Sequence, residues 1–407
     1  MVSADEAAAV AYLRTPLAIR ARCETILEVG LADELEHFTI ALDAMPRVID
    51  KVVQVMLAAD PELRIPFHGR IGQLRTGGVD RVAIFDARLA VLPVDERARI
   101  WADLITVSVL LDAGAGDAWR YREHATGVVV GRSEGLAVAS LHAFTAGLFS
   151  SDPAHPLRAD AAALRAIDPH ALAEAFQATV ANPIIGIDGR IGLIRDLGTA
   201  IAAAPERFVG GRPGGLVDHL RANGDTVSAP DLLAVLLEGL ASIWPVHIEL
   251  GGASLGDVWR HAAAGGTGPS AGLVPFHQLT QWLAYSLFEP LERAGITVSQ
   301  PDALTALAEY RNGGLLVDLG VLVPKHDRVR GLIHAAGDDV IVEWRALTVA
   351  LLDRVALGVR EKLAKSPAEL LLATLETGSR AAGRAIAAEQ RPAGGSPIRI
   401  NSDGTVF

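Results

Sequence analysis

The sequence predicts a mainly α-helical globular protein with a few short β-hairpins, and three observations support this prediction. The chain has 407 residues, enough to bury a large core. Half of the residues are hydrophobic but only 5% are aromatic, so aliphatic side chains must build that core, and the prominent alanines favour helix. No repeat of fixed period is present. We therefore expect residues 1–407 to form one compact helical unit, and the proline-rich connection at residues 149–160 is the best place for an internal boundary.

The first third of the chain alternates helical segments with loops. Apolar periodicity predicts helices within residues 4–60 and 96–114. Between them, residues 65–81 form a glycine-rich stretch that lacks the glycine and lysine order of a phosphate-binding loop. This stretch is either an ordinary loop or a ligand-binding loop.

A short β-hairpin is predicted at residues 118–130, because apolar and polar residues alternate on both sides of a turn. The alternation places Arg122 on a cationic face. Ser133 is expected to cap the next helix and Glu134 to lie in its first turn, where the helix dipole favours a carboxylate. These charged residues are either solvated at the surface or part of a pocket lining.

The second half continues with helices and one long glycine-rich segment. Helices are predicted over most of residues 160–242. Residues 247–272 are rich in glycine, and long loops of this kind are often functional, so Asp257 is a candidate catalytic carboxylate. His277 lies near the start of the following helix, where a lone histidine is more often structural than catalytic.

Residues 304–322 place charge inside an apolar helical pattern that glycine then interrupts. At about 100° per residue, Arg311 falls within roughly 60° of Leu304 and is expected to point inward. A buried guanidinium requires an ion-pair partner or an anionic ligand. Glu309 lies about 140° from Leu304 on the same ideal helix, away from the apolar face. Gly313 and the glycine after it either end this helix or allow a close backbone approach.

A second buried arginine is predicted at Arg345, within residues 342–359, which are apolar nearly all round. Arg311 and Arg345 would form either a structural network around Glu309 and Glu343 or a cationic pocket. At the end of the chain, the turn signal at Asp403 and Gly404 predicts a small hairpin within residues 397–407.

Charge and residue usage exclude several functions. The formal net charge of −11 provides no electrostatic footprint for nucleic acid. A single cysteine, Cys23, excludes an internal disulfide and suits the cytoplasm, and we expect neither a signal peptide nor a membrane span. No two of the twelve histidines are three or four residues apart, and dinucleotide and nucleotide-triphosphate motifs are missing, so we expect no metal and no cofactor. A site built from carboxylates and arginines remains.

Eight segments, in order along the chain, carry a resemblance to a known family: LDAGAGDAWRYRE (111–123), GRSEGLAVAS (131–140), GLFSSDP (147–153), LGDVWRH (255–261), GLVPFHQLTQWLAYSL (272–287), LTALAEYRNGGLLVDLGVL (304–322), VEWRALTVALL (342–352) and SDGTVF (402–407). They resemble the uracil catabolism protein 4 family, also known as domain of unknown function 1688. The pattern of residues 304–320, followed by Val-Glu-x-Arg, is also similar to the queuosine nucleotide N-glycosylase/hydrolase family. That family has Asp at the position of Glu309 and a lysine at the position of His277.

These resemblances imply an N-glycosidase of pyrimidine breakdown with a fold related to helical DNA glycosylases. The expected substrate is a small phosphorylated nucleoside derivative, ribosylurea 5′-phosphate, and the products are urea and ribose 5-phosphate. Glu309 is the leading catalytic candidate, because a carboxylate can stabilise an oxocarbenium-like sugar, and Asp257 and Glu134 follow it. The candidate substrate-binding and phosphate-binding residues are Tyr310, Arg311, Arg345, His277, Arg122 and Tyr285.

Two other functions stay open at this point. The chain could be an amidohydrolase or a ring-opening enzyme elsewhere in pyrimidine breakdown, although such an enzyme needs an activated water molecule and the metal-ligand spacing is missing. It could also be a non-catalytic protein that binds a nucleotide derivative. Saturable binding without turnover would favour this last function.

Overall fold

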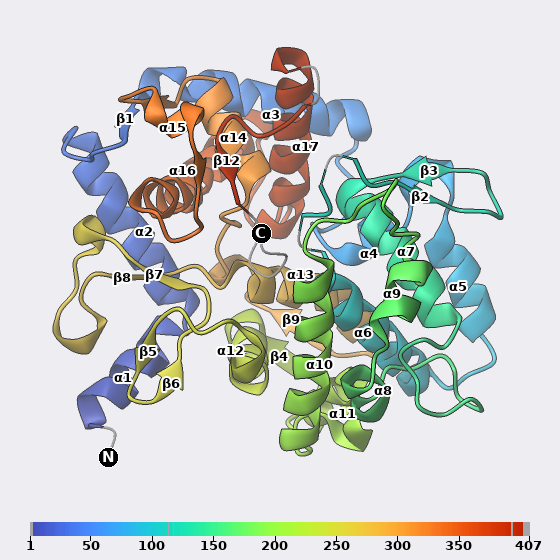
Figure 1. Ribbon diagram of the computed structural model, residues 1–407. Coiled ribbons are helices and arrows are strands. Elements are labelled where there is room, and N and C mark those ends of the chain that lie inside the picture. The colour runs from blue at the N-terminus through green and yellow to red at the C-terminus, as the bar shows by residue number, and fades with distance from the viewer. Residues whose placement is uncertain (1–2, 113, 117, 392–393, 402–407) are drawn as a thin grey trace. The chain divides into compact units, whose positions relative to one another are not determined.

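The protein is mainly α-helical, as the sequence predicts. A computed structural model describes residues 3–112, 114–116, 118–391 and 394–401. These residues form 17 α-helices and short strands that pair only in twos (Figure 1). Contacts divide the chain into two compact units. Unit 1 contains the chain up to His68, Val246–Gln281 and Gln300–Asn401, and unit 2 contains Gly69–Pro245 and Trp282–Ser299.

Unit 1 is built around one long buried helix. Its helices are α1 (Ala4–Leu13), α2 (Pro16–Leu31), α3 (Met45–Ala59), α14 (Tyr310–Asp318), α15 (Arg328–Gly331), α16 (Asp339–Leu363) and α17 (Leu372–Gln390). Helix α16 packs against α2, α3 and α14, and α17 packs against α3 and α14 (Figure 1). A helix that is apolar nearly all round needs neighbours on every side. The predicted burial of residues 342–352 is therefore confirmed, because every residue of this run is buried.

Four two-stranded ribbons complete unit 1. Three are antiparallel: β1 (Phe38–Ile40) with β10 (Leu322–Pro324), β5 (Glu249–Leu250) with β6 (Ala253–Ser254), and β7 (Val258–Arg260) with β8 (Leu273–Pro275). The fourth pairs β11 (Ile333–His334) with β12 (Arg399–Ile400) in parallel. The glycine-rich segment 247–272 thus contains the short ribbon of β5 and β6 and the strand β7, rather than being a single open loop.

Unit 2 has its core at helix α6 (Val94–Leu110), which is buried without interruption from residue 100 to its end. Around it lie α4 (Arg70–Gln73), α5 (Arg81–Leu89), α7 (Arg132–Thr145), α8 (Ala161–Arg165), α9 (Pro169–Ala175), α10 (Ile187–Ala203), α11 (Leu216–Arg221) and α12 (Ala229–Gly239). Strand β2 (Tyr121–Arg122) pairs with β3 (Val129–Val130), and β4 (Thr226–Ser228) with β9 (Thr297–Ser299). Helix α13 (Gln278–Arg293) begins in unit 1 and continues in unit 2.

Two local predictions need correction, and one lies outside the described residues. The helix expected from Leu304 begins only at Tyr310, since residues 305–309 are neither helix nor strand, and Gly313 lies inside α14 rather than at its end. Ser133 is not the cap of α7, since its hydroxyl donates to Asp112 and the capping position is residue 131. The predicted hairpin at 118–130 is confirmed, whereas the turn expected at 403–404 is outside the described residues.

Within the described residues, no helix is both long enough and apolar enough to cross a membrane.

Candidate functional site

Glu309 stands immediately before α14, where the extended chain turns into helix. Its backbone is extended (φ −95°, ψ 155°), and its side chain accepts a hydrogen bond from the backbone N–H of Asn312 at 3.0 Å. This is an N-terminal cap, which satisfies one of the free N–H groups of the first helical turn. Glu309 is half-buried. The backbone N–H of Asn312 thus holds the Glu309 carboxylate in place.

Three buried polar side chains extend this arrangement into a cluster. Glu376 and Ser379 lie on α17, and Asn312 lies in the first turn of α14. The amide nitrogen of Asn312 donates to Glu376 at 2.8 Å, and its amide oxygen accepts from the Ser379 hydroxyl at 2.9 Å. Glu376 also accepts from the backbone N–H of Leu307 at 3.2 Å. We call Glu309, Asn312, Glu376 and Ser379 the carboxyl cluster.

Burial raises the pKa of both glutamates of the carboxyl cluster, but different charges act on each of them. Burial raises the pKa of Glu376 to about 8, and the negative charge of Glu309 contributes to this increase. Burial also raises the pKa of Glu309, whereas the positive charges of Arg380 and Arg311 oppose the increase. Positive charges thus favour the ionised form of Glu309, whereas the negative charges of Glu309 and Asp353 oppose ionisation of Glu376. Neighbouring carboxyl groups with separated pKa values are a common basis of acid-base catalysis.

Close packing between α14 and α17 fixes the cluster. An added methyl group on Gly383 would lie 2.2 Å from the backbone oxygen of Arg311, so only glycine allows this approach. The Arg311 side chain is buried as predicted. It donates to the backbone oxygen of Gly394 at 2.7 Å, and its guanidinium lies 4.8 Å from the centre of the Tyr310 ring.

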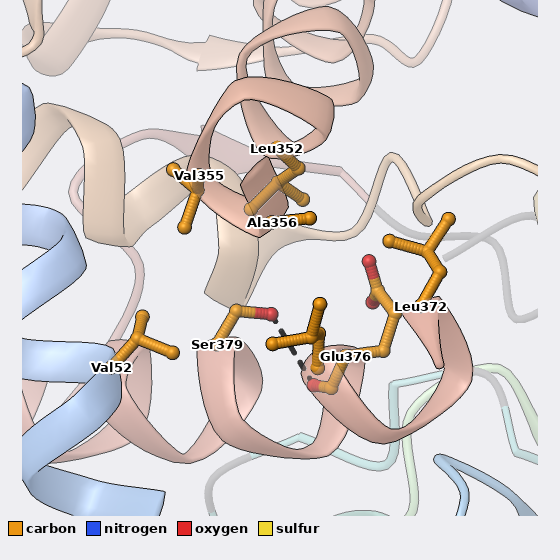
Figure 2. A pocket seen from close by; sticks show the side chains of 8 residues that line it. Val52, Leu352, Val355, Ala356, Leu372, Glu376 and Ser379 are labelled. Carbon is orange, nitrogen blue, oxygen red and sulfur yellow. Dashed lines mark hydrogen bonds between the residues drawn. The ribbon is translucent and has the colours of Figure 1, made fainter. Parts of the chain in front are cut away.

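A small cavity adjoins the cluster on the side of α16. Figure 2 shows that side chains from α3, α16 and α17 line it, including Glu376 and Ser379. Its volume of about 10 Å³ is close to the minimum for one water molecule and far below the size of a pocket for a small-molecule ligand. The cavity is lined mainly by aliphatic side chains and is too small for a nucleoside derivative.

Asp257 and Arg345 form a second polar site in unit 1. Both oxygens of Asp257 accept from the Arg345 guanidinium at 2.8 Å, and the indole N–H of Trp259 donates to the same carboxylate at 2.7 Å. Although burial opposes ionisation, Arg345 holds the pKa of Asp257 at about 2. Arg345 also lies over the Phe276 ring, 4.0 Å from its centre. This is the buried ion pair that the sequence suggested, but its carboxylate is Asp257 rather than Glu309 or Glu343.

The other candidates occupy separate environments. In unit 1, His277 is buried at the start of α13, its Nε2 contacts the backbone oxygen of Leu13 at 2.9 Å, and burial lowers its pKa. In unit 2, Arg122 is exposed on β2, and Glu134 is half-buried in the first turn of α7, as expected. Tyr285 is buried in α13, with its ring centre 5.5 Å from that of Phe288. Their functional roles stay predictions.

Sequence reasoning missed Glu376, Asn312 and Ser379. Asn312 was visible only as a residue near a helix end, and Glu376 lies 64 residues further along the chain. One signal was present: Glu376 directly follows the mostly apolar run at residues 370–375, a position that favours burial of a polar residue.

Fold and site together define a mainly α-helical protein with a buried carboxyl cluster. Within the described residues, no group of three or more His, Cys, Asp or Glu side chains is arranged to hold a metal ion. The chain belongs to the family described as protein of unknown function (DUF1688), which matches residues 12–407.

Two relatives cover nearly the whole chain. Protein urg3 of Schizosaccharomyces pombe is 38% identical over 409 residues, which span 98% of this chain and 99% of the relative. Uracil catabolism protein 4 of Lachancea kluyveri is 39% identical over 408 residues, which span 91% of this chain and 92% of the relative. The family membership expected from the sequence is confirmed.

Proposed function

We propose that this protein acts in uracil catabolism by hydrolysing the N-glycosidic bond of ribosylurea 5′-phosphate, giving urea and ribose 5-phosphate. The name of the Lachancea kluyveri relative supports the catabolic role. The observation that carries the reaction is Glu309, a half-buried carboxylate held at a helix start and influenced by the positive charges of two arginines. Glycoside hydrolysis commonly uses carboxylates that stabilise an oxocarbenium-like transition state.

The reaction breaks the bond between C1′ of the ribose and a urea nitrogen. As the bond breaks, positive charge develops on C1′ and the ring oxygen, and the Glu309 carboxylate stabilises that charge. Water supplies the oxygen that joins C1′, and a proton from water is transferred to the departing urea nitrogen. Glu309 serves this step either as the base that activates water or as the nucleophile.

Cationic side chains near Glu309 are suited to an anionic substrate. Arg380 lies one turn beyond Glu376 on α17, and its charge acts on Glu309. Arg311 and Tyr310 adjoin the same carboxylate in sequence. Binding energy from a phosphate group can position the sugar for reaction at C1′. Arg345 is less suited to this role, because Asp257 engages its guanidinium at two nitrogens.

The experiment is to measure urea release from synthetic ribosylurea 5′-phosphate by purified protein. We expect turnover by the wild type and a loss of at least about 100-fold in kcat for Glu309→Gln, which keeps the shape but removes the charge. Unphosphorylated ribosylurea should react with a much lower kcat/KM. Glu389→Gln, on the exposed part of α17, makes the same chemical change away from the site and should leave kcat unchanged.

Two results would contradict the proposal. One is turnover that is equal in wild type and Glu309→Gln, which would remove Glu309 from the reaction. The other is saturable binding of the phosphorylated compound without any urea, which would favour a binding protein. Circular dichroism of each variant confirms that a lost activity is not a lost fold.

A further inference from the structure

Asn312 connects the two carboxyl groups of the cluster through separate parts of the same residue. Its backbone N–H donates to Glu309, whereas its side-chain amide donates to Glu376 and accepts from Ser379. Asn312 and Glu376 are 0% and 1% exposed, respectively. Any rearrangement of Glu376 must therefore act on the first turn of α14, where Glu309 is held.

Two negative charges act on Glu376 and oppose its ionisation. Glu309 approaches from the start of α14 and Asp353 from α16. On α3 the cavity residue is the apolar Val52. Among the charges on elements packed against α17, Lys51 of α3 pairs with Glu389, and Asp302 of the segment Pro301–Ala303 pairs with Arg360. Arg311 of α14 donates to the backbone oxygen of Gly394.

Ionisation of Glu376 would place a second negative charge next to Glu309, on which the positive charges of Arg380 and Arg311 already act. Unpaired buried charge is strongly unfavourable, and two neighbouring carboxyl groups avoid ionising together. In the protonated form, Glu376 still accepts hydrogen bonds from Leu307 and Asn312 through its oxygens. The geometry thus supports a neutral Glu376 beside an ionised Glu309.

We propose that Glu376 is a positioning residue for Glu309: it stays protonated while Glu309 is ionised and, through Asn312, holds the Glu309 carboxylate in its reactive position. This inference rests on the proposed function, since it assigns Glu309 the reacting role. Glu376 itself does not touch the substrate. Loss of its proton adds negative charge near Glu309, which repels a phosphorylated substrate and disturbs the first turn of α14.

The pH profile of kcat/KM for urea release separates positioning from simple packing. We expect the wild-type value to fall above pH 8, by about tenfold per pH unit, as a single proton is lost. Glu376→Gln, which cannot ionise, should lower kcat/KM by about fivefold at pH 7, because it accepts one hydrogen bond fewer. Its profile should then stay flat across the same alkaline range.

Ser379→Ala is the matched control. It removes the hydroxyl that contacts the Asn312 amide but leaves Glu376 able to ionise. We expect a similar fivefold loss at pH 7 with the alkaline fall unchanged. The proposal is overturned if Glu376→Gln retains the wild-type alkaline fall, because another group must then cause it.

A second measurement does not depend on urea release. Carbon-13 NMR of protein labelled at the glutamate carboxyl carbons should show one glutamate that titrates near pH 8 in the wild type. In Glu309→Gln this midpoint should move toward the ordinary glutamate range, because a neighbouring charge is removed. If it does not move, the coupling is absent and the positioning role is wrong. If it moves while the wild type releases no urea, the proposed reaction is wrong but the coupled pair stands.

Discussion

Arg345 shows how a single residue decides between a structural and a ligand-binding role. The guanidinium is 2% exposed and meets a carboxylate in the two-pronged geometry that also suits phosphate. Asp257 already provides that contact, and the Trp259 indole holds Asp257 from another side. The partner was out of reach of sequence reasoning, because it lies 88 residues away on a glycine-rich segment.

We expect Asp257→Asn to lower the free energy of unfolding by about 3 kcal/mol or more at pH 7, since the buried Arg345 would lose the carboxylate that accepts from two of its nitrogens. Asp50→Asn is the control: it breaks an exposed pair with Lys362 and should cost less than about 1 kcal/mol. Urea denaturation of the three proteins measures both values. Equal losses in the two variants would contradict the structural importance of the buried pair.

The ion pair of Asp257 and Arg345 also makes the free energy of unfolding depend on pH. Because the folded-state pKa of Asp257 is about 2, below the ordinary 3.8, its contribution to stability is fully present above pH 4 and is lost as pH falls toward 2. The difference between wild type and Asp257→Asn should therefore shrink below pH 4. A difference that stays constant to pH 2.5 would show that Asp257 titrates like an exposed carboxyl group.

At the scale of elements, the close contact between α14 and α17 requires a glycine at position 383. Gly383→Ala should lower the free energy of unfolding by about 1 to 3 kcal/mol, because the new methyl group collides with the Arg311 backbone oxygen. The matched control is Gly192→Ala in α10, where a methyl group meets no atom within 4 Å and alanine favours helix. Thermal unfolding should thus separate the two variants in opposite directions; a stabilised Gly383→Ala would refute the tight contact.

Helices and strands could be predicted where the local pattern of apolar and polar residues determines them. Helix α16 follows from an apolar run, and the hairpin of β2 and β3 follows from alternation around a turn. The start of α14 was not predictable in this way, because the residues before it are apolar enough to read as helix but are neither helix nor strand in the structure. There the capping bond from Asn312 to Glu309 and the packing on α17 outweigh local propensity.

The candidate site was predictable only in part, for a related reason. Glu309 and Arg311 were identified from one stretch of sequence, and both lie at the carboxyl cluster or beside it. Glu376 could not be placed with them, because a pattern within α17 carries no information about the helix that α17 packs against. Its protonation depends on burial and on Glu309, which are properties of the folded chain.

At the scale of the whole molecule, unit 1 takes its residues from three separate parts of the chain. Helix α16 meets α2 from the beginning of the chain, and α14 meets α17 near its end. We expect a chain that ends at residue 370 to leave unit 1 incomplete while unit 2 keeps its core. Hydrogen exchange should then show protected amides in α6 and exchanging amides in α14; protection of α14 without α17 would contradict this.

This arrangement has a consequence for a chain that leaves the ribosome from its N-terminus. Helix α2 emerges early, but the final partners in its unit, including α17, are translated more than 300 residues later. At the usual rate of elongation this interval is on the order of half a minute. During that time the apolar faces of α1 to α3 lack their native neighbours, so the nascent protein depends on chaperones or on transient contacts to avoid aggregation.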